Sequence, residues 1–187
     1  MSDSKKTGGL AGITAGETAI CTVGKEGAGL TYRGYDIYDL AENARFEEVA
    51  YLLHYGKLPN QSELDAYLER LKGMRWLPDA LKSTLEVIPG DSHPMDVLRT
   101  GCSLLGNLEP EGGFENQTRV ADRLLAAFPS MLLYWWRFHA DGKRIETETD
   151  DDSIAGHFLH LLHGEPPSDF HRHSCSRHPR SKSPVRR

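Results

Sequence analysis

The 187-residue chain has few cysteines, and their number and spacing exclude a disulfide framework. Cys21, Cys102 and Cys175 are three in number and lie far apart. Such a set favours free thiols in a reducing compartment over the paired cysteines of a secreted domain. We therefore expect Cys21 and Cys102 to be small core residues without a redox role.

Long apolar runs are also absent. No stretch approaches the roughly 18–20 apolar residues that a helix needs to cross a bilayer, and the start, Met1 to Lys6, lacks the apolar core of a secretion signal. The sequence therefore predicts a cytoplasmic protein with no membrane partner.

The common motifs of nucleotide and nucleophile chemistry are missing too. Gly24, Gly27 and Gly29 precede no Gly-Lys-Ser/Thr, so they indicate a turn and not a phosphate loop. No serine lies in a nucleophile elbow. Taken alone, the residues predict a helical domain without a catalytic site.

Histidine is frequent, with nine residues, but its spacing does not favour a metal site. His157, His160 and His163 fan over roughly 120° of a helix with about 100° per residue, and no glutamate follows the first. A second group of ligand-type side chains lies near the end: His171, His173, Cys175 and His178. This single short cluster lacks paired zinc-site spacing, and the acidic residues 150–152 suit a helix start better than a metal loop. We predict no metal site.

What the sequence does contain is a series of helical apolar patterns after a short β-rich start. Residues 18–23 and 30–32 predict a small N-terminal β-hairpin. Seven helices follow, over residues 36–41, 46–55, 63–74, 78–88, 93–105, 118–139 and 154–162. Asp36, Ser62 and Ser92 are the expected N-caps of three of them. The fold class is therefore mainly α.

The helix expected over residues 118–139 carries the widest apolar stripe. Its second half presents Leu132, Trp135, Trp136 and Phe138. Aromatic side chains bury large areas and need a large partner surface. We expect much of this stripe to be exposed in the 187-residue chain.

Composition divides the chain into three parts: a flexible leader over residues 1–17, a helical domain over residues 18–164, and a basic tail over residues 165–187. The tail carries six Lys or Arg against two Asp or Glu, whereas residues 1–164 carry 16 against 25. A tail this rich in proline, serine, arginine and histidine is expected to be disordered. One interpretation makes it a nucleic-acid binder, but six cations attached to an acidic body are a modest signal, so we expect no nucleic acid.

Three segments resemble one enzyme family. They are residues 18–37, with Tyr-Arg-Gly-Tyr at 32–35; residues 92–101, with His-Pro-Met-Asp at 93–96; and residues 148–164. Over residues 9–170 the chain resembles the N-terminal part of a citrate synthase. Cys-Thr-Val-Gly-Lys at 21–25 and Asp-Asp-Asp-Ser at 150–153 resemble the 2-methylcitrate synthase branch of that family.

The resemblance implies a helical homodimer with a citrate synthase-like large domain. Such enzymes join propionyl-CoA or acetyl-CoA to oxaloacetate and hydrolyse the thioester, in this branch for propionate catabolism. Acyl-CoA is a substrate, so no cofactor is implied. An aspartate takes the α-proton while one histidine stabilises the enol and a second polarises the keto group.

The residues that perform this chemistry in the family do not occur in the sequence. Neither a His-Glu-Phe-Asn-Ala-Ser-Thr-like nor a His-Gly-Gly-Ala-Asn-Glu-like stretch is present, and His163-Gly164 continues as Glu-Pro-Pro. We therefore expect this chain to be an inactive fragment and assign no catalytic residue. By resemblance, Gln61 and His173 correspond weakly to substrate contacts, although a surface loop is the simpler interpretation of both.

The abrupt change of composition after His173 indicates a reading-frame shift in the gene. Two other interpretations stay open at this point. One is a non-catalytic helical module for dimerisation or interaction, and the other is the basic-tail binder described above.

Overall fold

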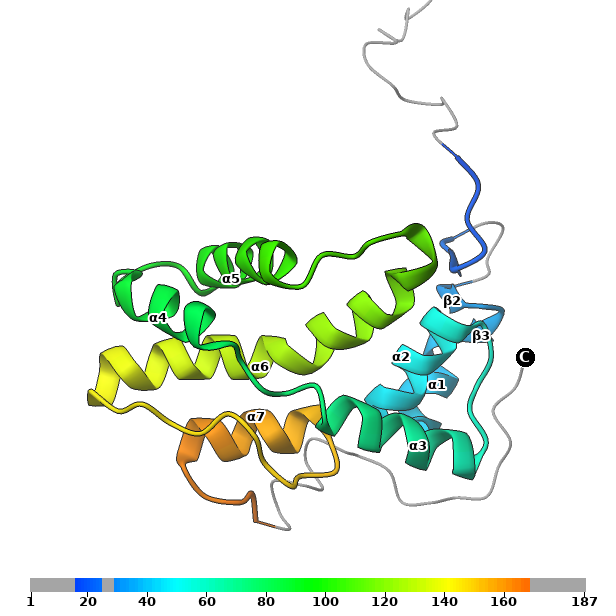
Figure 1. Ribbon diagram of the computed structural model, residues 1–187. Coiled ribbons are helices and arrows are strands. Elements are labelled where there is room, and N and C mark those ends of the chain that lie inside the picture. Colours follow the sequence, from blue (N-terminus) through cyan, green and yellow to red (C-terminus); the bar gives the residue numbers. More distant parts are fainter. Residues whose placement is uncertain (1–15, 25–28, 169–187) are drawn as a thin grey trace, which may run out of the picture.

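The computed structural model describes residues 16–24 and 29–168 (Figure 1). Most of the predicted leader and tail therefore lies outside the described residues. The same holds for His171, His173, Cys175 and His178.

The described chain starts with a small antiparallel sheet of three two-residue strands, β1 (Cys21–Thr22), β2 (Thr31–Tyr32) and β3 (Tyr35–Asp36). The expected hairpin is thus extended by β3, which the sequence analysis missed. Arg33 and Gly34 connect β2 to β3 with φ angles of 51° and 88°. Two successive positive φ angles are typical of the tightest hairpin turns, so this Arg-Gly pair reverses the chain at once.

The seven expected helices are all present, which confirms the mainly α class. They are α1 (Ile37–Asn43), α2 (Phe46–Tyr55), α3 (Gln61–Lys72), α4 (Asp79–Val87), α5 (Pro94–Leu108), α6 (Gln117–Asp141) and α7 (Ile154–His163), with a short 3-10 turn, η1 (Phe114–Asn116), before α6.

One of the three expected N-caps is confirmed. The Asp36 carboxylate accepts the Tyr38 N–H at 2.8 Å and caps α1. Ser62 was wrong, because Asn60 caps α3 and exchanges hydrogen bonds with Glu63 in a capping box.

The expected cap of α5, Ser92, was also wrong. His93 is the N-cap, and its Nδ1 accepts the Met95 N–H at 3.2 Å. Proline favours the first helical position, so Pro94 assigns the cap to the residue directly before it. The helix also passes the expected end at residue 105 and reaches Leu108.

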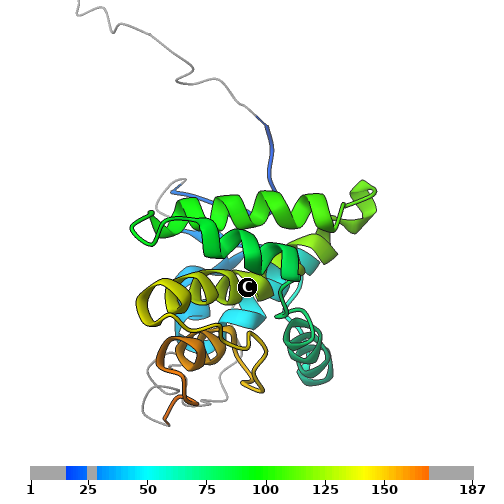
Figure 2. The same ribbon diagram turned by 60° about the vertical axis from the view of Figure 1, so that its left-hand side comes forward.

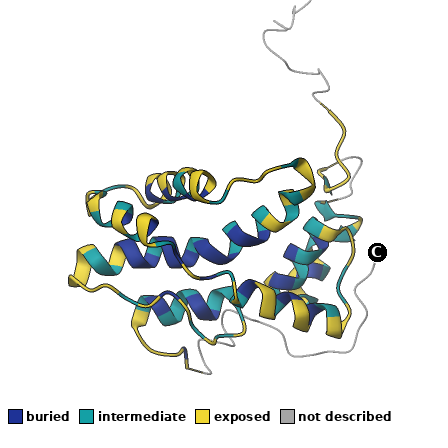
Figure 3. Ribbon diagram, in the orientation of Figure 1, coloured by how far each residue is buried: buried dark blue, intermediate teal, exposed yellow. Residues whose placement is uncertain are grey.

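Helix α6 is the centre of the molecule. It packs against α4 and α5 on one side and α7 on the other, in both views of the ribbon (Figures 1 and 2). Buried residues concentrate along its middle, where the helix runs unbroken through Pro129 (Figure 3). The main core cluster consists of Leu77, Leu81, Leu85, Val97, Leu105, Ala127, Met131, Tyr134 and Trp135.

The aromatic stripe of α6 is more buried than expected. Trp135 is only 3% exposed, and its indole N–H donates to the carbonyl oxygen of Ile88 at 3.3 Å. Leu132 and Phe138 are half-buried, and Trp136 is 40% exposed. The expectation of a widely exposed stripe is therefore wrong for Trp135, because α4 and α5 already cover that face.

Cys21 and Cys102 are free thiols, each half-buried rather than in the core. Within residues 16–24 and 29–168, no helix combines the length and the apolarity that a membrane span requires.

Candidate functional site

The two predicted substrate contacts are not brought together in the described structure. Gln61 is the exposed first residue of α3, and its side-chain amide donates to the Asp65 carboxylate at 2.7 Å, within the same helix. His173 lies outside the described residues. A substrate role for either residue stays a prediction.

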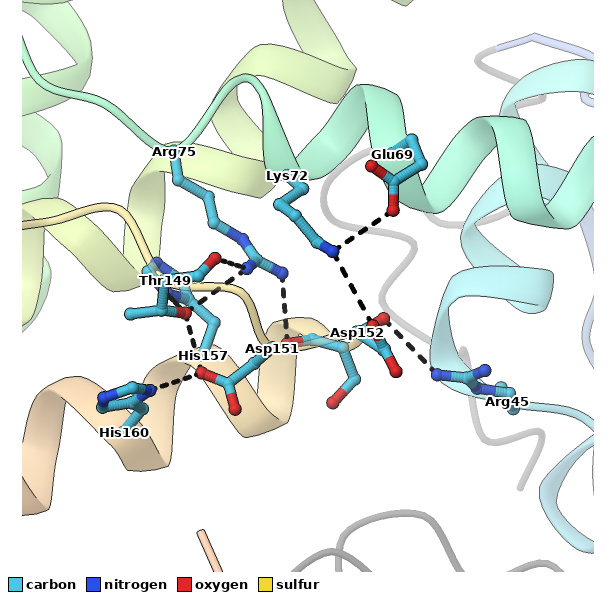
Figure 4. A network of polar contacts seen from close by, with 10 residues as sticks. Arg45, Glu69, Lys72, Arg75, Thr149, Asp151, Asp152, His157 and His160 are labelled. Atoms are coloured by element: carbon cyan, nitrogen blue, oxygen red, sulfur yellow. Dashed lines mark hydrogen bonds and ion pairs between the residues drawn. The ribbon is translucent and has the colours of Figure 1, made fainter. Parts of the chain in front are cut away.

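The densest polar network lies where the connection between α6 and α7 crosses the molecule. We call residues 142–153 the crossover segment. Arg75, in the connection between α3 and α4, is 2% exposed and reaches into this segment (Figure 4). Its guanidinium donates to the carbonyl oxygens of Thr149 at 2.7 Å and Ser153 at 3.4 Å. Arg75 thus ties the crossover segment to the α3–α4 connection.

Carboxylates surround this buried cation. Burial lowers the pKa of the Arg75 guanidinium, while the charges of Asp151 and Glu47 offset part of that effect. Glu47, on α2, is buried and accepts the Ile154 N–H at 2.9 Å. A side chain from α2 therefore satisfies a free N–H in the first turn of α7.

The acidic residues before α7 have separate roles. Ser153 is the N-cap, with its hydroxyl oxygen accepting the Gly156 N–H at 2.9 Å. The Asp151 Oδ2 atom lies 2.7 Å from both Thr149 Oγ1 and His160 Nδ1. The interpretation of this run as a helix start is confirmed, whereas the sequence carried no signal for the Asp151–His160 contact.

His157 is the deepest titratable group in the network. Its side chain is fully buried, with Nε2 3.0 Å from Ser130 Oγ and Nδ1 3.0 Å from Thr149 Oγ1. Burial, followed by the charge of Arg75, lowers the pKa of His157 to about 3. The ring is therefore neutral near pH 7.

The Ser130–His157 contact has the distance of a nucleophile and its base, yet its surroundings exclude that role. Ser130 and His157 are both 0% exposed, and both ring nitrogens contact internal hydroxyl groups. No substrate reaches either side chain without opening the core. This pair holds α6 and α7 together.

A shallow depression of about 340 Å³ lies beside the network, at the C-terminal end of α3. It is lined by Glu69, Lys72, Gly73, Glu148, Thr149 and Asp150. Of these side chains only Lys72 is cationic, and its ammonium lies 3.2 Å from Glu69 Oε1. Three carboxylates and the negative end of a helix disfavour anionic ligands here. Among the described residues, no three or more His, Cys, Asp or Glu side chains form a group that could hold a metal ion.

A second buried carboxylate joins α2, α3 and α6. Asp122 accepts the hydroxyls of Tyr55 at 2.6 Å and Tyr67 at 3.0 Å, with His54 Nδ1 at 3.1 Å and Arg70 Nη2 at 3.3 Å. Burial and then the hydrogen bond to Asp122 raise the pKa of Tyr55 to about 12. The phenol thus remains a donor at neutral pH, and this cluster also binds helices together.

The chain is similar to one protein family and to individual enzymes of that family. The family model described as the C-terminal domain of citrate synthase matches residues 9–176. The 2-methylcitrate synthase of Shewanella oneidensis is 67% identical over 173 residues, which cover 91% of this chain and 46% of that protein. The 2-methylcitrate synthase of Mycobacterium tuberculosis strain H37Rv is 37% identical over 88% of this chain and 42% of its own length.

Solved structures of citrate synthases have a similar fold. The crystal structure of citrate synthase from Thermotoga maritima superposes with a TM-score of 0.74 at 32% identity, covering 88% of this chain and 43% of that one. The chain therefore spans less than half the length of the relatives it matches.

Proposed function

The chain belongs to the citrate synthase family, and we propose that it is part of a 2-methylcitrate synthase. The intact enzyme would condense propionyl-CoA, or acetyl-CoA, with oxaloacetate and hydrolyse the thioester in propionate catabolism. The observation that carries this proposal is the 67% identity to the Shewanella oneidensis 2-methylcitrate synthase over 91% of the chain. The relatives described above are all named as synthases, which does not favour a non-catalytic module or a nucleic-acid binder.

The condensation needs groups that the described residues do not supply. The α-proton of a thioester is a weak acid, so a base must remove it while a positioned donor neutralises the enolate oxygen. In the described part of the chain, His157 is buried and neutral and Asp151 is occupied by Thr149 and His160. We infer that the reacting groups belong to the part of the relatives that these 187 residues do not span, and that residues 1–187 alone are inactive.

The remaining features of the proposal follow from the resemblance. Acyl-CoA is a substrate, so the reaction requires no cofactor. The intact protein would act in the cytoplasm as a homodimer, and Gln61 and His173 are the candidate substrate contacts. The helical scaffold corresponds to residues 18–164.

The test compares three purified polypeptides in an assay for free CoA thiol with propionyl-CoA and oxaloacetate. They are the 187-residue chain, a chimera of residues 1–168 followed by the remaining part of the Shewanella oneidensis enzyme, and that enzyme itself as the control. We expect no CoA release by the first and release by the other two, faster with propionyl-CoA than with acetyl-CoA.

Two results would contradict the proposal. A folded chimera that releases no CoA would show that residues 1–168 do not serve as the first part of a 2-methylcitrate synthase, and steady release by the 187-residue chain would show that it contains its own catalytic groups. Circular dichroism of the chimera distinguishes an inactive enzyme from an unfolded one.

A further inference from the structure

Five side chains of the buried network form one continuous series of hydrogen bonds from α6 to the surface of α7. Ser130 on α6 contacts His157 on α7, and His157 contacts Thr149 on the crossover segment. Thr149 contacts Asp151, which contacts His160 (Figure 4). The four contacts measure 3.0, 3.0, 2.7 and 2.7 Å, in order from Ser130 to His160. All are hydrogen-bond distances, so each needs one proton between its two atoms.

The supply of protons in this series is limited. Ser130 and Thr149 each carry one hydroxyl proton, and a neutral imidazole carries one proton on one of its two nitrogens. Ser130 has a further acceptor within reach, the carbonyl oxygen of Thr147 at 3.2 Å. Three protons are therefore available for four contacts, which are Thr147–Ser130, Ser130–His157, His157–Thr149 and Thr149–Asp151. The tautomer of His157 decides which of these contacts has no proton.

With the proton on Nδ1, His157 donates to Thr149 and Thr149 donates to Asp151. Ser130 then donates to Nε2, and the 3.2 Å contact to Thr147 lacks a proton. With the proton on Nε2, His157 donates to Ser130, Ser130 donates to Thr147, and Thr149 donates to Nδ1. The 2.7 Å contact between Thr149 and the Asp151 carboxylate then lacks a proton.

The two arrangements differ in the hydrogen bond that each gives up. The contact to Asp151 is the shortest of the four and involves a charged acceptor, and such bonds are about twice as strong as neutral ones. The contact to Thr147 is neutral and the longest. An ionised Asp151 therefore favours the Nδ1–H tautomer of His157, and loss of the charge on Asp151 removes this preference.

We propose that the charge of Asp151 sets the tautomer of His157 through the hydroxyl of Thr149, and so directs the proton of Ser130. With Asp151 ionised, Ser130 donates to His157, and its 3.2 Å contact to the Thr147 carbonyl oxygen lacks a proton. With Asp151 neutral, the Nε2–H group of His157 donates to Ser130, so the bond between α6 and α7 is kept, and Ser130 donates to Thr147 and adds a bond between α6 and the crossover segment. The charge of Asp151 thus decides whether Ser130 holds α6 to the crossover segment as well as to α7.

The charged groups around the series favour the first arrangement at neutral pH. Burial alone would raise the pKa of Asp151, but hydrogen bonds from Thr149 and His160 and the charges of His160 and Arg75 outweigh it and lower the pKa. Asp150, Asp152 and Glu47 favour the charged form of Arg75, the cation beside this series. Asp151 therefore stays ionised until the pH falls below its ordinary pKa of 3.8.

The experiment is nitrogen NMR of the 187-residue chain with its histidines labelled with ¹⁵N. His157 is identified by the signal that is lost in His157→Gln. In the unchanged chain we expect a neutral ring with the proton on Nδ1 throughout pH 5–8. In Asp151→Ala the proton should move to Nε2, whereas the control Asp150→Ala, which changes an exposed neighbouring carboxylate, should leave it on Nδ1.

Thr149→Val provides a second route to the same result. It removes the linking hydroxyl while keeping the shape of the side chain, and it should also move the proton to Nε2. An Nε2–H ring in the unchanged chain would overturn the proposal even if no variant folds. So would an Nδ1–H ring in folded Asp151→Ala, or a His157 that titrates near the ordinary pKa of about 6.5.

Discussion

Replacing Arg75 with methionine tests whether the buried network stabilises the fold through charge. Methionine keeps most of the length and volume of the arginine stem, so the main loss is the guanidinium with its hydrogen bonds to the Thr149 and Ser153 carbonyl oxygens. The buried carboxylate of Glu47, which is 2% exposed, would then lose the favourable interaction with the charge of Arg75.

The expected cost is large compared with the stability of a domain. A hydrogen bond to a charged group contributes about 1.5–3 kcal/mol, and the buried guanidinium donates two of them to carbonyl oxygens. Whole domains are stable by about 5–15 kcal/mol. We therefore expect Arg75→Met to lose about a fifth or more of the free energy of unfolding at pH 7.

The assay is urea denaturation followed by circular dichroism, with Arg99→Met as the control. The Arg99 side chain is 76% exposed and its Nη2 lies 3.1 Å from Asp96 Oδ1, which is also exposed, and exposed pairs contribute only about 0–1 kcal/mol. A loss of less than about 1 kcal/mol in Arg75→Met, equal to that of the control, would refute the reasoning and show that the buried carboxylates do not depend on Arg75.

The effect of Arg75→Met on stability should depend on pH, because Arg75 helps to lower the pKa of Asp151. The folded pKa of Asp151 lies below its ordinary value of 3.8, so its contribution is complete above that value and is lost as the pH falls through the folded pKa. Arg75 is one cause of that lowering. The difference between Arg75→Met and the unchanged chain should therefore shrink as the solution is acidified below about pH 4.

Three further predictions concern the packing and the caps. Asp122→Ala should cost about 3–5 kcal/mol, measured by urea denaturation, because it leaves Tyr55 and its neighbours without their shared buried acceptor; a cost below about 1 kcal/mol would contradict this. Trp136→Gln should raise solubility without loss of helix, whereas Trp135→Gln should unfold the chain, and equal behaviour of the two would show that α4 and α5 do not cover Trp135. Asn60→Ala should lower the thermal midpoint by the equivalent of about 1 kcal/mol while Ser62→Ala changes it little, and the reverse order would restore Ser62 as the cap.

Local rules predicted most of the fold, because helices depend on spacing along the chain. The seven helices follow from apolar periodicity, and Gly56 and Gly164 end α2 and α7 in the left-handed conformation that favours glycine. The errors at Ser62 and Ser92 arose because two candidate caps lay within two residues of each other. Only the geometry of the first turn separates such candidates.

The polar networks could not be predicted, because their partners lie far apart in the sequence. Nothing near Asp122 indicates Tyr67, and nothing near Arg75 indicates Thr149, 74 positions away. The spacing of the histidine triplet gave no indication of which histidine is buried, because the burial of His157 depends on the packing of α7 against α6. Burial is a tertiary property, so no helical pattern alone separates a core histidine from a surface one.

The hydrogen bond from the Ile154 N–H to Glu47 links the order of synthesis to the stability of the chain. Glu47 and Ile154 are 107 positions apart, so a side chain that leaves the ribosome long before α7 completes the hydrogen bonds of its first turn. When α7 emerges, this acceptor is already in place on a folded neighbour, provided that α2 has formed. A defect near residue 47 would therefore show itself as fraying at residue 154, and proteolysis of the last helix would report damage in the second.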